Sequence, residues 1–238
     1  ALPATVLHSV AAVAAGMSAD DLVFSYRLPH WAARVLYPGG PELGMVRMTI
    51  GGTLVRRRVV VTGMGAVTPL GNDMETTWDG LLSGRSGVDR ISCFDPSELT
   101  VQIAAELKDF DVNERLGRRR ARRSGRFSLV ALDAAHQAVE DSELDLSGDD
   151  VDRERVGVLI GTGIGGVLVL LESYDVYQDR GPHRVSPFMI PSLMPNAASA
   201  LIAIDYDLKG VNFAISSACA TGSHAIGEAA GMIRRGDV

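Results

Sequence analysis

The sequence has few cysteines, few aromatic side chains and no long apolar run. It has two cysteines, Cys93 and Cys219, in 238 residues, too few for a disulfide framework or a thiolate-only metal site. This scarcity indicates a reducing, cytoplasmic setting. The uncharged run Val156–Leu171 contains five glycines and is shorter than the roughly 20 residues that a bilayer requires. We therefore expect no membrane-spanning segment and no membrane partner.

The chain also lacks net positive charge and clustered metal ligands, and both absences exclude classes of function. The formal net charge is −6, which argues against general nucleic-acid binding. The five histidines form no cluster with cysteine or aspartate at metal-ligand spacing. We expect neither a metal site nor a cofactor. Aromatic residues make up 5% of the chain, so the core is expected to consist mainly of Val, Leu, Ile and Ala.

The chain divides by composition near residue 55. Residues 1–55 are turn-rich, carry no recognisable chemistry and do not begin with Met, so we expect a leader of unknown status outside the fold. Met45 and Met48 are the candidate initiators. Residues 56–238 are expected to form one incomplete domain, because the last residues stop where another strand should begin.

Within 56–238, buried strands alternate with amphipathic helices, which predicts an α/β fold. One strand is expected at Val59–Val61, buried on both faces and ended by a turn at Gly63–Gly65. A long helix, almost wholly buried, is expected at Met189–Ile204. The other predicted strands are residues 155–160 and 211–217, and the other predicted helices are residues 75–82, 127–140 and 220–235.

Cys219 follows a predicted strand and directly precedes a predicted helix. The helix dipole and the unpaired N–H groups at a helix N-terminus favour the thiolate. The same N–H groups can stabilise the oxyanion that forms when a thioester is attacked. This position indicates a nucleophile, and the alternative is a small residue packed in the core.

Two glycine clusters follow strands without completing a nucleotide-binding motif. In Gly63-Met64-Gly65 the third glycine of a dinucleotide fingerprint is replaced by Thr68. The cluster from Gly161 to Gly166 lacks the Lys-Ser/Thr pair of a phosphate loop.

Four ordered motifs resemble the β-ketoacyl-ACP synthases, especially the type II fatty-acid condensing enzymes. The resemblance covers residues 56–238. The motifs are Arg57-Arg58-Val59-Val60-Val61-Thr62-Gly63-Met64-Gly65 with Thr68-Pro69-Leu70-Gly71, then Gly161-Thr162-Gly163-Ile164-Gly165-Gly166, Ser186-Pro187-Phe188-Met189-Ile190-Pro191, and Ser217-Ala218-Cys219-Ala220-Thr221-Gly222.

The resemblance implies the N-terminal half of a thiolase-like α/β fold, a homodimer, and elongation of acyl-ACP with malonyl-ACP. Cys219 is then the nucleophile that carries the acyl group, and its own N–H supplies part of the oxyanion hole. Ile164 lies at the acyl pocket with Phe188 nearby. The resemblance places the two catalytic histidines and the second oxyanion donor in the C-terminal half. We therefore expect this polypeptide alone to keep a nucleophile but to lack condensing activity.

Seven arginines gather between Arg115 and Arg126. A solvated helix face is the plain interpretation. A basic patch also suits electrostatic steering of an acidic partner, and acyl carrier proteins are strongly acidic. Arg119, Arg122 and Arg123 occupy the positions that contact the carrier protein in the family that this chain resembles.

His224 follows Cys219 by five residues, so the two are not expected to share a helix face; a structural role is expected. Three alternatives to the fatty-acid enzyme stay open. They are a polyketide ketosynthase on the same fold, a non-catalytic chain-length partner, and a structural α/β domain with a buried cysteine. The Ala220-Thr221-Gly222 continuation favours the fatty-acid type, and the presence of Cys219 argues against the chain-length partner.

Overall fold

The computed structural model describes the backbone of residues 9–13 and the whole of residues 58–238. In these ranges three two-stranded sheets form, β1 with β2, β3 with β4 and β5 with β6. The strands are β1 (Ser9–Val13), β2 (Gly63–Val67), β3 (Asp89–Arg90), β4 (Ile103–Ala104), β5 (Val158–Gly161) and β6 (Asn212–Ile215). The α-helices are α2 (Met74–Leu82), α3 (Val112–Leu116), α4 (Arg118–Ala121), α5 (Arg126–Asp141), α6 (Val167–Arg180), α7 (Met189–Leu193), α8 (Ala197–Asp205) and α9 (Thr221–Arg235). Short 3-10 helices are η1 (Arg153–Arg155), η2 (Pro182–Arg184) and η3 (Ala218–Ala220).

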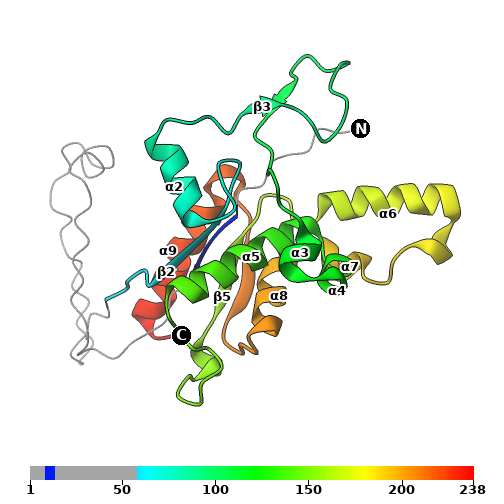
Figure 1. The fold of residues 1–238 in the computed structure, drawn as a ribbon. Helices are drawn as coiled ribbons and strands as arrows, with labels where there is room; N and C mark the ends of the chain where they lie inside the picture. Colours follow the sequence, from blue (N-terminus) through cyan, green and yellow to red (C-terminus); the bar gives the residue numbers. More distant parts are fainter. Residues whose placement is uncertain (1–8, 14–57) are drawn as a thin grey trace. The chain divides into compact units, whose positions relative to one another are not determined.

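Helix α5 supplies most of the core and packs between β2 and α8 (Figure 1). The apolar residues that predicted this helix are buried in it: Leu129, Ala131, Leu132, Ala135 and Val139. The alternation of strands and helices is present as predicted, so the α/β class is confirmed.

The first strand was predicted wrongly. The structure places β2 at Gly63–Val67, where the sequence predicted a turn, and leaves the side chains of Val60 and Val61 exposed. A Cβ on Gly63 would lie 2.1 Å from the carbonyl oxygen of Ala138, and one on Gly65 would lie 1.9 Å from that of Ala134. The glycines therefore let α5 lie directly against the strand; they do not end it.

Strands β5 and β6 are parallel, and Gly161 at the end of β5 pairs with Ile215 at the end of β6. Because parallel strands point the same way, the segments that follow them leave the sheet at the same edge. The first is the glycine cluster 161–166, and the second is the turn that carries Cys219.

The predicted long helix at Met189–Ile204 is two helices, α7 and α8. Pro195 lies between them and has no backbone N–H to continue a helical ladder. The segment is also less buried than expected, since Ile190 is 57% exposed and Ile204 is 78% exposed.

Most of residues 1–55, which we expect to stand outside the fold, lie outside the described residues. The exception is β1, which pairs antiparallel with β2 from Ser9 opposite Val67 to Val13 opposite Gly63. The status of the segment as a whole remains a prediction. In the ranges that the structure covers, no helix has both the length and the apolar character needed to cross a bilayer.

Candidate active site

The turn that carries Cys219 runs from Ser216 to Thr221, and we call it the cysteine turn. It connects β6 to α9, as the sequence predicted, and Cys219 is the middle residue of η3. Its side chain is exposed. Helix α9 begins at Thr221, so the thiol lies one short turn before the first residue of the helix.

The backbone of the cysteine turn adopts an uncommon conformation. Ala218 has a φ of 50°, in the left-handed region that residues with a Cβ rarely adopt. Strain of this kind gathers at functional sites, where surrounding contacts hold it in place. Here the strained residue immediately precedes the thiol.

The glycine cluster 161–166 lies directly against the cysteine turn. A Cβ on Gly161 would lie 2.6 Å from the carbonyl oxygen of Thr221, so only glycine allows this approach. The hydroxyl of Ser216 donates to the carbonyl oxygen of Gly163 at 2.9 Å. The structure therefore brings together two of the four motifs singled out in the sequence.

The glycine cluster is held from inside by Thr162, whose side chain is buried. Its N–H donates to the carbonyl oxygen of Ile215 at 3.0 Å, and its Oγ1 accepts from the N–H of Gly165 at 3.1 Å. Gly165 has a φ of 70°, which favours glycine. Next to it in the cluster, the side chain of Ile164 is 57% exposed.

Phe188 lies beside the arginine run. It is the N-cap residue of α7, and the guanidinium of Arg123 lies 5.0 Å from the centre of its ring. The hydroxyl of Ser192, on α7, donates to the carbonyl oxygen of Arg123 at 2.8 Å. The structure thus joins Phe188 to the arginine run, while its placement at an acyl pocket beside Ile164 stays a prediction.

The seven arginines divide into two groups. Arg115 forms a two-pronged ion pair with the buried carboxylate of Asp133, with both N···O distances at 2.8 Å, and Arg120 pairs with Asp205. Arg119, Arg122 and Arg123 are exposed and make no ion pair within the described part of the chain. The residues chosen from the sequence are therefore among those whose charge is free to meet a partner.

Asp205 also accepts a hydrogen bond from His136 at 2.7 Å. Burial lowers the pKa of His136, and the nearby guanidinium of Arg120 lowers it further. The negative charge of Asp133 acts in the opposite direction and raises the pKa of His136. This cluster ties α4, α5 and α8 together and is structural.

His224 has a hydrogen-bond partner in the cysteine turn, a contact that the sequence did not predict. Its Nδ1 lies 2.6 Å from the hydroxyl oxygen of Ser217, two residues before the thiol. It does not reach Cys219 itself, so the expectation that the two do not meet is consistent with this geometry. The spacing of seven residues between Ser217 and His224 could have indicated the pair only if the intervening turn had been known.

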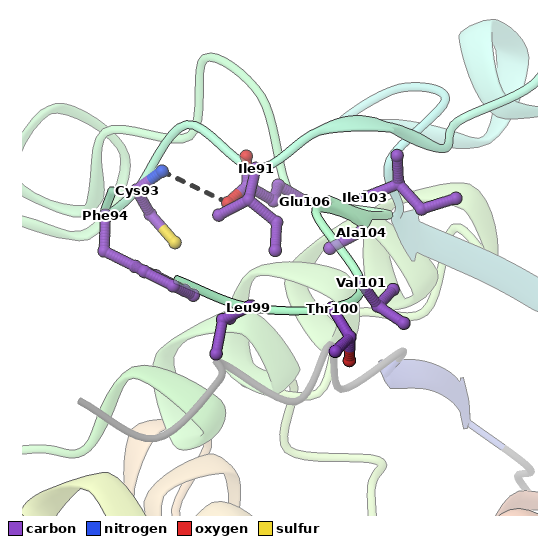
Figure 2. A pocket seen from close by; sticks show the side chains of 9 residues that line it. All are labelled: Ile91, Cys93, Phe94, Leu99, Thr100, Val101, Ile103, Ala104 and Glu106. Carbon is purple, nitrogen blue, oxygen red and sulfur yellow. Dashed lines mark hydrogen bonds between the residues drawn. The ribbon is translucent and has the colours of Figure 1, made fainter. Parts of the chain in front are cut away.

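The other cysteine lies in the β3–β4 region, beside a mostly apolar pocket of about 350 Å³ (Figure 2). The carboxylate of Glu106 accepts from the N–H of Cys93 at 3.2 Å and from the N–H and hydroxyl of Ser92. The hydrogen bond from the Cys93 thiol and then the bonds from Ser92 lower the pKa of Glu106 to about 2. The same carboxylate raises the pKa of the Cys93 thiol. The pocket is lined by Ile91, Cys93, Phe94, Leu99, Thr100, Val101, Ile103, Ala104 and Glu106.

The structure is that of an α/β protein that presents an exposed cysteine on a strained turn between a strand and a helix. The matching family is described as "Beta-ketoacyl synthase, N-terminal domain", and the match covers residues 56–238. The chain belongs to this family, so the resemblance seen in the motifs is confirmed.

The relatives found are condensing enzymes. The chain is 44% identical over 181 residues to "3-oxoacyl-[acyl-carrier-protein] synthase 2" of Staphylococcus aureus (strain N315), an alignment that covers 76% of this chain and 43% of the relative. It therefore spans less than half the length of that relative. It also resembles the solved structure of the ishigamide ketosynthase/chain length factor, with a TM-score of 0.69, 28% identity, and coverage of 77% of this chain and 46% of that one. A third relative is a type II polyketide ketosynthase solved in complex with its acyl carrier protein, with a TM-score of 0.61, 25% identity, and coverage of 75% and 47%. These likenesses confirm the thiolase-like fold and its N-terminal half.

Proposed function

We propose that this chain is the nucleophile-bearing part of a fatty-acid condensing enzyme, a 3-oxoacyl-ACP synthase that works in the cytoplasm. The Cys219 thiolate attacks the carbonyl carbon of an acyl-ACP thioester, and the resulting tetrahedral oxyanion collapses with loss of the carrier thiolate. Malonyl-ACP then loses CO₂, and its carbanion attacks the acyl group on Cys219. The C–C bond forms as the Cys219 thiolate leaves, which gives 3-oxoacyl-ACP.

The position of Cys219 is the observation that carries this proposal. The thiol is exposed, follows a strained residue, and lies just before the N-terminus of α9. Within the described ranges, the backbone N–H of Cys219 donates no hydrogen bond. It is therefore available to a developing oxyanion, as an oxyanion-hole donor must be.

Acyl carrier protein is the proposed partner, and Arg119, Arg122 and Arg123 are its proposed contacts. All three are exposed and make no ion pair within the described chain, and the guanidinium of Arg123 lies over the ring of Phe188. One of the structural relatives was solved with its acyl carrier protein bound, which supports this class of partner. Free guanidinium groups suit bidentate recognition of carboxylates.

We propose two further features by the same reasoning. Ile164 and Phe188 face the acyl chain, and both are at least 39% exposed, so an acyl group could reach them.

A second copy of the chain covers α6, which has no buried residue although it carries large apolar side chains. The exposed ones are Leu168, Leu170, Tyr174 and Tyr177. Apart from β1, which pairs with β2, the segment 1–55 is proposed to lie outside this unit.

The polyketide ketosynthase remains the second candidate because two of the structural relatives are ketosynthases of other pathways. The fatty-acid assignment has stronger support, because identity to the fatty-acid enzyme is 44% and identity to those structures is 28% and 25%. A non-catalytic chain-length partner would have no use for the nucleophile that this chain keeps.

The test of the nucleophile is acyl transfer to the chain itself. The full chain is incubated with a long-chain acyl-ACP, digested, and mapped by mass spectrometry. We expect one acyl adduct on Cys219, none in Cys219→Ala, and an unchanged adduct in Cys93→Ala. An adduct on Cys93, or no adduct at all, contradicts the proposal.

The test of the partner surface is charge reversal. We expect Arg119→Glu, Arg122→Glu and Arg123→Glu each to weaken carrier binding by about threefold to thirtyfold at low salt, with a smaller loss at high salt. Arg90→Glu is the matched control, since Arg90 is exposed on β3. Equal losses in the control and the three variants would show a net-charge effect and no docking site.

A further inference from the structure

The strained backbone at Ala218 needs contacts that hold it. A non-glycine residue at a φ of 50° is strained and persists only where its surroundings fix it. The conformation of Ala218 sets the direction of the next peptide N–H, which is that of Cys219. Whatever holds this turn therefore aims the N–H that the reaction uses.

Three side-chain hydrogen bonds hold the cysteine turn. Ser216 donates to the carbonyl oxygen of Gly163 at 2.9 Å, at the start of the turn. Thr221 donates to the carbonyl oxygen of Ala218, within the turn. The third joins Ser217 to His224 at 2.6 Å.

The Ser217–His224 bond differs from the other two in its span. Ser217 precedes Ala218, and His224 lies in the first turn of α9, so the bond closes a loop around Ala218, Cys219 and Ala220. It is thus the contact that fixes the start of the cysteine turn to the body of the helix. His224 makes a hydrogen bond to Ser217 and, among the described residues, none to the Cys219 thiol, so we expect any effect on the reaction to pass through the backbone.

We propose that His224 is a positioning residue that, through Ser217, holds the Cys219 N–H in the direction that a thioester oxyanion requires. The inference rests on the proposed function, in which Cys219 takes an acyl group. It assigns His224 a role in the acyl-transfer step and none in proton transfer.

The experiment separates a reaction that builds an oxyanion from one that does not. Acylation of Cys219 by acyl-ACP needs the oxyanion donor, whereas alkylation by iodoacetamide reports the thiol alone. Both rates are measured at Cys219 by peptide mapping on the full chain. The variants are His224→Ala, Ser217→Ala, the double variant and His224→Asn, with Ser223→Ala as the control on the same exposed stretch of α9.

We expect His224→Ala and Ser217→Ala each to slow acylation by about threefold to tenfold, the size expected for loss of one hydrogen bond. Alkylation should change by less than about twofold, and the double variant should be no slower than either single one. His224→Asn should recover part of the rate, because the side-chain amide of asparagine can place a polar atom near the position of Nδ1. Ser223→Ala should behave as the unmodified chain.

Equal losses in acylation and alkylation overturn the inference, because they would place the effect on the thiol or on folding. Unchanged acylation in His224→Ala overturns it as well. If the unmodified chain is not acylated at Cys219, the proposed function fails separately. The positioning claim is then decided by amide hydrogen exchange in the peptide 216–222, where it requires faster exchange in His224→Ala and fails if exchange is unchanged.

Discussion

The β3–β4 region and the cysteine turn each present one exposed cysteine, but in opposite surroundings. Cys93 lies beside an apolar pocket, and its backbone N–H is already bonded to the carboxylate of Glu106. Cys219 lies before a helix N-terminus, and the described structure gives its N–H no acceptor. Both thiols can be reached from solvent.

The difference shows that exposure alone does not select a nucleophile. A thiol reacts as the thiolate, and a neighbouring carboxylate disfavours that form. Glu106 raises the pKa of Cys93 chiefly through its side-chain hydrogen bond and also through its charge. Cys219 instead lies near backbone N–H groups, which can stabilise a negative charge on the reacting groups and carry no negative charge themselves.

Gly161→Ala should have the largest effect on this comparison. The new Cβ would lie 2.6 Å from the carbonyl oxygen of Thr221, which is backbone and cannot rotate away. We expect a loss of about 1–3 kcal/mol in the free energy of unfolding, measured by urea denaturation. The acylation rate of Cys219 should fall, because the added carbon pushes on the cysteine turn, while alkylation of Cys93 should not change.

Gly163→Ala is the matched control for that variant. Its Cβ would meet no atom within 4 Å, so stability and both cysteine reactions should stay close to those of the unmodified chain. If the two variants lose equal stability, the close approach of β5 to α9 is not what requires glycine at 161.

The labelling rates of the two cysteines should differ by a smaller factor. At pH 7.5 we expect iodoacetamide to modify Cys93 several-fold more slowly than Cys219, because the raised pKa of the Cys93 thiol lowers its thiolate fraction. The pKa of Cys93 is raised, so its thiolate fraction, and with it its labelling rate, should keep rising as the pH increases through 9. A Cys93 that is labelled as fast as Cys219 at neutral pH would remove the distinction between the two regions.

The helical part of the fold could be predicted because the pattern is local. Helix α5 follows from apolar residues at helical spacing, and it is where the sequence placed it. The strand β2 could not be predicted, since Gly63 and Gly65 read as a turn until α5 is known to lie against them. The split between α7 and α8 was missed although Pro195 signalled it in the sequence.

The site divides in the same way. The position of Cys219 between a strand and a helix is written in consecutive residues, and the sequence therefore predicted it. The pairing of Arg120 with Asp205 could not be predicted in this way, because the two residues are 85 positions apart in the sequence. The bond between Ser217 and His224 was missed for a different reason: it depends on the path of a turn whose conformation no propensity favours.

Glu106→Gln should produce the smallest change in cysteine reactivity. It tests the comparison at Cys93, whereas the glycine variants test it at Cys219. The amide removes the negative charge that raises the pKa of Cys93, so that pKa should fall and the thiolate fraction at pH 8 should rise. We expect Cys93 to be alkylated several-fold faster, because a larger fraction of its thiol is then the reactive thiolate. Cys219 lies in another part of the fold and should keep its rate.

Glu98→Gln is the control for that change, because Glu98 is an exposed carboxylate in the same β3–β4 region. It removes one negative charge without touching the bonds to Ser92 and Cys93, so both cysteines should react as before. If Glu98→Gln accelerates Cys93 as much as Glu106→Gln does, the general charge of the region suppresses the thiol. Acceleration in Glu106→Gln alone assigns the suppression to the hydrogen-bonded carboxylate, which is the feature that Cys219 lacks.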